Sequence, residues 1–405
     1  MPNGQPPSRR RLVSVALSLG IVIAGFYVLS RGQNFFVPLV IAFIAVYLVA
    51  ILGGLIRRFQ IGEWRVPKFL SVILSFAIIF GLGYGFIAVV ANNASHIAAA
   101  APRYQVRFQH LQAELLAKAG IQESPEFQQL VRGIDLRSVF TTVAKGVAGL
   151  VENITLVFIY GLFIMLELRF VPVKFKSLFP DPGRRQRAAT IFRRIDKEIH
   201  TYLGVKTAVS FATALLSYLL MRLVGLDFAE FWALLIFVLH FIPTVGVIVG
   251  TLLPTILAAV QFQNLGPVLG IGIGLTAIAQ LMGSIVEPNL MGETLNLSPL
   301  AVIMALIFWG TLWGITGAFL CVPLTVILVI VMSNFDSTRW VAVLLSKTGV
   351  LRLPPEDGET EEEGSETGEV GSEKGKVRGE RGEGRPWEEI LDFKLISRSE
   401  IAGVN

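Results

Sequence analysis

Few side chains in the long apolar stretches of this chain could do chemistry, and Glu287 is the clearest of them. It closes an apolar stretch that begins at Pro267, and it stands directly before Pro288. An ionisable group in lipid is costly unless it is paired or hydrated, so it marks a functional site. Gln280 lies seven residues earlier, close to two helical turns, and is therefore expected on the same face. Together the two could line a path and bind a cation or a hydroxylated solute; otherwise Glu287 only marks the membrane interface.

His240 is a second candidate, because it stands in an otherwise apolar segment three residues before Pro243. It could carry protons near neutral pH, or it could be a hydrogen-bonded packing residue. Thr244 follows the proline and could reach backbone groups that the break leaves unpaired, and Gly246 completes the same break. Asn289 belongs to a polar link that is read equally well as part of the path or as an exposed turn.

Glycine and proline residues mark a further set of candidates for gating or helix packing. Three of the glycines have the small-xxx-small spacing that lets helices approach closely, so packing is favoured over a flexible gate for them. Lys206 and Arg222, at the two ends of one apolar stretch, are expected to extend to the membrane interfaces. The gating or packing candidates are Pro254, Pro288, Gly292, Pro299, Gly310, Gly314, Gly317 and Pro323.

The elements that must position these residues include two apolar segments, 228–260 and 299–332, each broken near its middle by proline or glycine. A helix rises about 1.5 Å per residue and a bilayer core is about 30 Å thick. Each segment is too long for one upright span and short for two, which predicts a re-entrant hairpin or a kinked, tilted helix. Paired breaks of this kind point to the substrate path of a transporter.

Composition places the chain among membrane proteins. Of its 405 residues, 53% are hydrophobic and 16% charged, against about 25% charged in soluble proteins. Long apolar runs predict an all-α, polytopic membrane protein with about eight hydrophobic segments in a lipid bilayer. The four histidines are scattered and Cys321 is the single cysteine, so no metal, cofactor or internal disulfide is expected. The net charge of +5 reflects basic loops beside apolar runs, not a nucleic-acid surface.

Charge and hydropathy divide the chain into five parts. Basic patches at 9–11, 57–68 and 174–197 place both termini in the cytoplasm by the positive-inside rule. The link 287–298 then faces the cytoplasm if both broken segments are hairpins, and the outside if they are kinked spans. The parts are a basic N-terminus (1–11), three transmembrane helices (12–91), an extracytoplasmic amphipathic helical insert (92–145), a transport core (146–353) with a basic cytoplasmic loop (169–200), and a disordered charged tail (354–405).

Four motifs in the second half of the chain resemble the autoinducer-2 exporter family of bacterial membrane proteins. The resemblance implies a multi-spanning inner-membrane transporter without an ATPase, assembled as a homo-oligomer. Members are linked to export of autoinducer-2 and others to sodium/proton antiport; many carry a histidine where Ser298 stands, so no role of that histidine transfers. The motifs are Phe-Ile-Pro-Thr-Val-Gly at 241–246 with Pro254, Ile-Val-Glu-Pro-Asn-Leu-Met-Gly at 285–292, Leu-Ser-Pro-Leu at 297–300, and 308–317 with Val-Pro-Leu at 322–324.

The sequence thus supports a ranked set of functions. It contains no Walker A, Gly-x-Ser-x-Gly or paired-histidine zinc motif, so we expect neither an enzyme nor a built-in ATPase. The first hypothesis is a secondary transporter that exports a small polar solute. The alternatives are a sodium/proton antiporter, which handles a monovalent cation, and a non-transporting scaffold or sensor.

Overall fold

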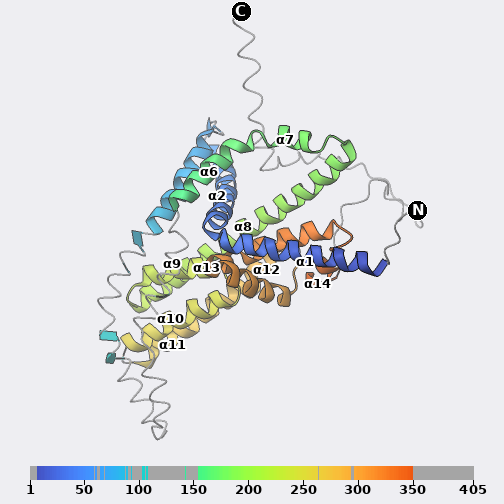
Figure 1. Ribbon diagram of the computed structural model, residues 1–405. Coiled ribbons are helices and arrows are strands. Elements are labelled where there is room, and N and C mark those ends of the chain that lie inside the picture. Colours follow the sequence, from blue (N-terminus) through green and yellow to red (C-terminus); the bar gives the residue numbers. More distant parts are fainter. Residues whose placement is uncertain are drawn as a thin grey trace, which may run out of the picture.

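The described part of the chain folds almost entirely into helices (Figure 1). The computed structural model describes residues 7–58, 60–61, 64–67, 69–86, 88–89, 93, 103–104, 106–107, 142, 154–262, 264–292 and 296–349. Two short strands, β1 (Gln60–Ile61) and β2 (Trp64–Arg65), pair antiparallel. The helices are α1 (Pro7–Arg31), α2 (Gln33–Arg58), an unlabelled helix Phe69–Phe86, α6 (Ile154–Leu168), α7 (Val171–Leu178), α8 (Pro182–Val224), α9 (Ala229–Leu239), α10 (Val245–Gln261), α11 (Leu265–Gln280), the π-helical η1 (Leu281–Val286), α12 (Glu287–Met291), α13 (Pro299–Ser333) and α14 (Arg339–Leu345).

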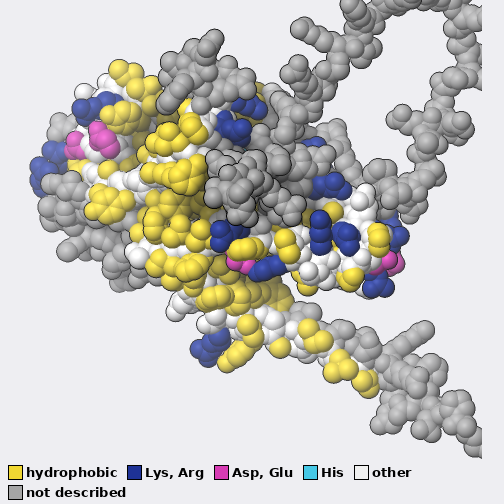
Figure 2. All heavy atoms as spheres, turned by 90° about the horizontal axis from the view of Figure 1, so that it is seen from above, with side chains coloured by type: hydrophobic (Ala, Val, Ile, Leu, Met, Phe, Trp, Pro, Cys, Tyr) yellow, Lys and Arg dark blue, Asp and Glu magenta, His cyan; other side chains and the backbone are white. Residues whose placement is uncertain are grey.

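The expected polytopic helical membrane protein is confirmed. Among the described residues five helices are long and apolar enough to cross a membrane, or six with the bent pair α6–α7. The five are α2, Phe69–Phe86, α8, the continuous run Leu265–Met291 (α11, η1 and α12) and α13. Figure 2 shows hydrophobic side chains spread widely over one face, as expected of a surface that meets lipid.

The basic segment 169–200 forms helix rather than an irregular loop. It makes α7 and the beginning of α8, which is 43 residues long. Asp181 caps α8, because its side chain accepts a hydrogen bond of 2.7 Å from the backbone N–H of Arg184. At about 1.5 Å per residue α8 is roughly twice as long as a bilayer core is thick, so part of it extends beyond the membrane. The tail 354–405 and most of the insert 92–145 lie outside the described residues.

The first broken segment is a hairpin of α9 and α10 joined by residues 240–244, hereafter the first hairpin. Its two ends are tied together at the base, where the Gln261 side chain donates to the Gly225 carbonyl and accepts from the Asp227 N–H, both at 2.8 Å. At the turn, Gly246 lies so close to Leu239 that a Cβ there would stand 1.8 Å from the Leu239 carbonyl oxygen. Only glycine fits this approach.

The second broken segment, α13, also turns back on itself and is hereafter the second hairpin. Its backbone leaves helical geometry at Trp313 (φ −129°, ψ 18°) and Gly314 (φ 62°, ψ −143°). The Trp309 indole N–H donates to the Thr325 hydroxyl at 3.1 Å, although these residues would lie about 24 Å apart along a straight helix. Each broken segment is therefore folded back, and neither is a single kinked span.

The two hairpins approach each other from opposite ends of one long helical run. That run, Leu265–Met291, has 27 residues and is about 40 Å long, and it leads from the base of the first hairpin toward the start of the second. The turn of the first hairpin meets the second arm of the second hairpin, where the rings of Phe241 and Phe319 stack with centroids 4.7 Å apart. Helix α8 packs against α9, α11 and α13, so it contacts both hairpins and the run between them.

A short part of the insert rests on the base of the first hairpin. Tyr104 is only 4% exposed, and its hydroxyl donates to the Asp227 carboxylate at 2.6 Å. Arg107 donates to the Gln261 carbonyl at 3.4 Å. Burial and the adjacent Asp227 carboxylate both raise the pKa of Tyr104, so its hydroxyl stays protonated as the donor at neutral pH. This short part of the insert therefore contacts the end of the hairpin.

We expect Tyr104→Phe to loosen this attachment. A hydrogen bond to a charged group contributes about 1.5 to 3 kcal/mol, so the thermal unfolding midpoint in detergent should fall by a few degrees. Tyr84→Phe is the matched control, because Tyr84 is 71% exposed, and it should leave the midpoint unchanged. Equal midpoints for wild type and Tyr104→Phe would show that the contact does not hold the insert in place.

Candidate functional site

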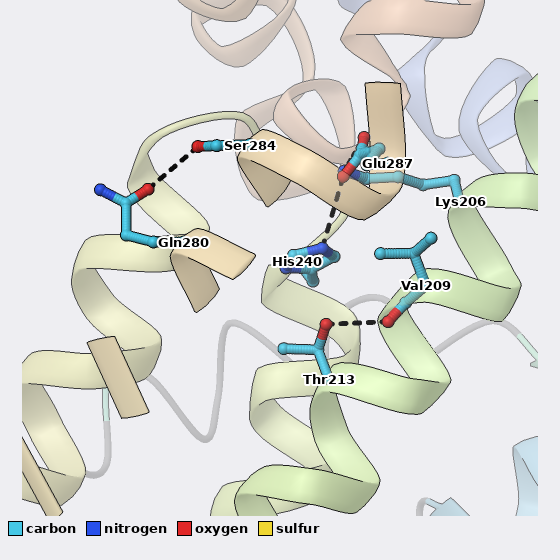
Figure 3. Close-up of polar contacts among 7 residues, drawn as sticks. All are labelled: Lys206, Val209, Thr213, His240, Gln280, Ser284 and Glu287. Atoms are coloured by element: carbon cyan, nitrogen blue, oxygen red, sulfur yellow. Dashed lines mark hydrogen bonds and ion pairs between the residues drawn. The ribbon is translucent and has the colours of Figure 1, made fainter. Parts of the chain in front are cut away.

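Three titratable side chains from three elements meet beside the tip of the first hairpin (Figure 3). Lys206 of α8 donates a hydrogen bond of 2.7 Å from Nζ to Oε1 of Glu287, the first residue of α12. Nε2 of His240, at the end of α9, lies 3.5 Å from Glu287 Oε2. Lys206 and His240 are 7% and 6% exposed. These three residues are called the buried triad below.

The triad places a charge pair away from water. Two opposite charges attract strongly where the local dielectric is low, but each has also lost its hydration, so the pair depends on both partners. Lys206 was expected to extend to the membrane interface, and this expectation is wrong for the described geometry, because its ammonium group points inward to Glu287 (Figure 3). Arg222 does reach the surface, with its side chain 69% exposed near Glu230.

Gln280 does not join Glu287, contrary to the prediction of a shared face. Its side chain is exposed and accepts a hydrogen bond from the Ser284 hydroxyl at 3.1 Å (Figure 3). The cause is η1, because the prediction assumed an unbroken α-helix. A π-helix has i→i+5 hydrogen bonds and more residues per turn, so it changes the direction in which later side chains point. Such π-helical turns are frequent at functional sites.

A buried polar seam on α8 leads away from the triad. Lys206, Ser210, Thr213 and Ser217 recur every three or four residues and are all buried, so they share one face. Buried Met221 continues this face beyond Ser217. The sequence prediction overlooked the seam, although its signal was present as small polar residues at helical spacing in an apolar stretch.

A small pocket opens where this seam meets the first hairpin and α11. In the described state its interior has room for about one water molecule, within about 250 Å³ of unfilled space that is partly open to the surroundings. His240 belongs both to the pocket lining and to the buried triad, which connects the two features. The lining residues are Thr213, Ser217, Ile236, His240, Gly246, Val247, Gly250, Thr251, Leu275 and Ala279.

The other residues expected in the path lie around the break or away from it. Pro243 and Thr244 form the turn, and Thr244 is held at φ 61°, ψ −57°, a strained conformation for a residue with a Cβ. Its side chain does not cap α10, so the expected contact with unpaired backbone groups is not formed. Gly246 lines the pocket. Asn289 is exposed on α12 and does not line the pocket.

The gating and packing candidates divide between turns, helix starts and helix interiors. Gly314 provides the kink of the second hairpin, and Gly317 lies so close to Trp309 that a Cβ would stand 1.8 Å from its carbonyl oxygen. Gly310 has only an ordinary contact with Ala318. Pro288 is the second residue of α12 and Pro299 is the first of α13. Gly292 ends α12 with φ 57°, and Pro254 and Pro323 are buried inside α10 and α13.

Comparisons with known proteins match most of the chain. Residues 17–336 match the model of a family described as AI-2E family transporter. The AI-2 transport protein TqsA of Escherichia coli strain K12 is 31% identical over 82% of this chain and 96% of its own length. A putative transport protein of Borreliella burgdorferi is 29% identical over 84% and 92%. A sodium-lithium/proton antiporter of Halobacillus andaensis is 24% identical over 82% and 97%.

Proposed function

Since this chain belongs to the AI-2E transporter family, we propose that it is a secondary transporter that exports a small polar solute of the autoinducer-2 type. The chain is a membrane transporter; the solute, the direction and the coupling are the proposal. The observation that carries it is the buried triad. A carboxylate held by an ammonium group and a histidine, beside a broken helix, stays ionised while these partners are in place and can take up a proton once movement of the hairpin separates them.

The mechanism follows from the two states of Glu287. When ionised, Glu287 is held by Lys206 and lies near His240, which belongs to the tip of the first hairpin. A proton on Glu287 removes the negative charge and weakens both contacts, so the tip is released. The stack of Phe241 on Phe319 would hold the two hairpins together in one state. In the other state the stack would be broken and the hairpins would separate. Coupling of protonation to hairpin movement would give alternating access without a catalytic site or ATPase.

Sodium/proton antiport is a second candidate, supported by the same carboxylate. Carboxylate oxygen is a hard ligand that suits small cations, and the relative from Halobacillus andaensis is named a sodium-lithium/proton antiporter. In this alternative, sodium and a proton compete for Glu287. We propose for either function that both termini lie in the cytoplasm, on the basis of the basic segments beside the apolar helices. Membership of the transporter family supports the further proposal of a homo-oligomer in the bacterial inner membrane.

Glu287→Gln tests the proposal in proteoliposomes loaded with AI-2. We expect a pH gradient to drive AI-2 flux in the wild type, and at least a tenfold loss in Glu287→Gln, because glutamine cannot take up and release the proton. Glu230→Gln is the control, since Glu230 is an exposed carboxylate outside the triad, and it should keep wild-type flux.

The outcomes separate the two candidates. Flux of AI-2 at the wild-type rate in Glu287→Gln would remove the carboxylate from the coupling mechanism. Proton release on addition of sodium chloride, measured with a pH-sensitive dye in vesicles without AI-2, would favour antiport. An AI-2 flux that ignores the pH gradient would contradict proton coupling.

A further inference from the structure

The small pocket beside the buried triad offers mainly oxygen lone pairs. Thr213 donates its hydroxyl proton to the Val209 carbonyl at 2.8 Å (Figure 3). Thr251 donates its own to the Val247 carbonyl at 2.9 Å. A hydroxyl that donates its hydrogen bond to a carbonyl of its own helix still has lone pairs that can accept a hydrogen bond from a bound ligand. Two of the hydroxyls of this pocket are therefore acceptors, and a suitable guest brings hydrogen-bond donors.

The pocket has no charged lining of its own. Its residues include neither a carboxylate nor an ammonium or guanidinium group, and His240 is the titratable member. Beyond His240 lie Lys206 and Glu287, whose charges balance each other. A cation there would have no balancing carboxylate and would lie near the ammonium group of Lys206, and an anion would find too few donors. This balance favours an uncharged guest.

The walls of the pocket combine polar and apolar surface. Ile236, Leu275 and Ala279 supply apolar contact, and Gly250 lets α10 approach α9, because a Cβ there would lie 3.3 Å from Ile236. Small-solute sites are typically apolar with a few placed polar groups. One turn along the α8 seam, the hydroxyl of fully buried Ser210 has no hydrogen-bond partner within the described chain, which marks this seam as a place where a polar guest is favoured.

We propose that this pocket, widened by movement of the first hairpin, is the solute-binding site and that it takes a small, uncharged molecule rich in hydroxyl groups. The proposal rests on the transporter function above and names the site and the class of solute. His240 is then a positioning residue, since it lines the pocket and also lies against Glu287. Solute bound in the pocket would fix the His240 ring and so favour one charge state of Glu287.

Binding to purified protein in detergent tests the site independently of transport. Isothermal titration calorimetry with AI-2, and with glycerol as a simple uncharged polyol, should show binding to the wild type. Thr213→Val should weaken that binding about tenfold, through loss of one hydrogen-bond acceptor. Thr276→Val is the matched control, because Thr276 also donates to its own helix, at the Gly272 carbonyl, but is exposed outside the pocket. It should bind like the wild type.

Three other variants keep the result interpretable. Thr213→Ser retains the hydroxyl and should keep wild-type affinity, so weak binding by Thr213→Val cannot be ascribed to misfolding if Thr213→Ser and Thr276→Val bind normally. Thr251→Val, on the α10 side of the pocket, should weaken binding by a similar factor. Glu287→Gln should still bind AI-2 although it does not transport it, which separates failure of the site from failure of the coupling mechanism.

Three outcomes would overturn the proposal. The first is that neither AI-2 nor glycerol binds to the wild type. The second is that Thr213→Val and Thr251→Val bind AI-2 with unchanged affinity. The third is that sodium or lithium chloride binds to the wild type and that Thr213→Val abolishes this binding while AI-2 binding persists. The last outcome would make the pocket a cation site.

Discussion

Gly246→Ala is expected to prevent the first hairpin from forming its native turn. The added Cβ would stand 1.8 Å from the carbonyl oxygen and 2.5 Å from the carbonyl carbon of Leu239. Both atoms are backbone, so no side-chain rotation relieves the clash, and α9 and α10 must separate. We expect a loss of about 4 kcal/mol or more, at the upper end for single substitutions. Separation of the arms would also displace His240 from Glu287, so transport would be lost in any protein that still folds.

The measurement is the yield of monodisperse protein by size-exclusion chromatography from membranes solubilised in detergent. Gly317→Ala should behave in the same way, because its Cβ would stand 1.8 Å from the Trp309 carbonyl oxygen in the second hairpin. Gly270→Ala on α11 is the control, since nothing lies within 4 Å of the Cβ that it adds. A normal yield and normal AI-2 flux for Gly246→Ala would mean that the hairpin turn is not required.

The hairpins were foreseeable from the sequence because their cause is local. Proline lacks an N–H and glycine allows positive φ, so the breaks at Pro243 and Gly314 are visible in the residues themselves. Comparison of each segment's length with the thickness of the membrane then leaves two structures for a broken segment, a re-entrant hairpin or a kinked span. The sequence did not decide between these two structures, because the choice depends on contacts across the turn, such as that of Trp309 with Thr325.

The composition of the buried triad was only partly predictable. Glu287 and His240 each attracted attention alone, as polar groups in apolar stretches, but nothing local indicates that they meet. Lys206 lies 81 residues from Glu287, and its position near the end of an apolar stretch equally suits a side chain that extends to the interface. The π-helical turn of η1 is likewise set by packing, so a constant helical period placed Gln280 on the wrong face.

A double-mutant cycle on Lys206 and Glu287 is expected to separate stability from transport. Removal of one partner leaves the other buried without its counter-charge, at a cost of about 3 to 5 kcal/mol. Lys206→Met and Glu287→Leu should therefore each lower the thermal unfolding midpoint strongly. The double variant replaces the pair by apolar groups and should recover most of that loss, since buried ion pairs are often no more stabilising than apolar replacements.

Transport should not recover with stability in the double variant. A leucine and a methionine pack together but take up no proton, so the folded protein would keep its solute pocket and lose coupled AI-2 flux. The surface pair Arg222–Glu230, whose atoms are 4.0 Å apart and whose side chains are 69% and 51% exposed, is the control. Removal of either member should change stability by about 0 to 1 kcal/mol, because solvent screens the attraction.

The cycle has two results that would contradict this account. A double variant as unstable as either single variant would mean that Lys206 and Glu287 do not depend on each other in the folded protein. A double variant that transports AI-2 along a pH gradient would show that protons pass elsewhere. The expected pattern, a stable protein without coupled flux, would assign to the pair a role that packing alone does not explain, because apolar groups fill the same space equally well.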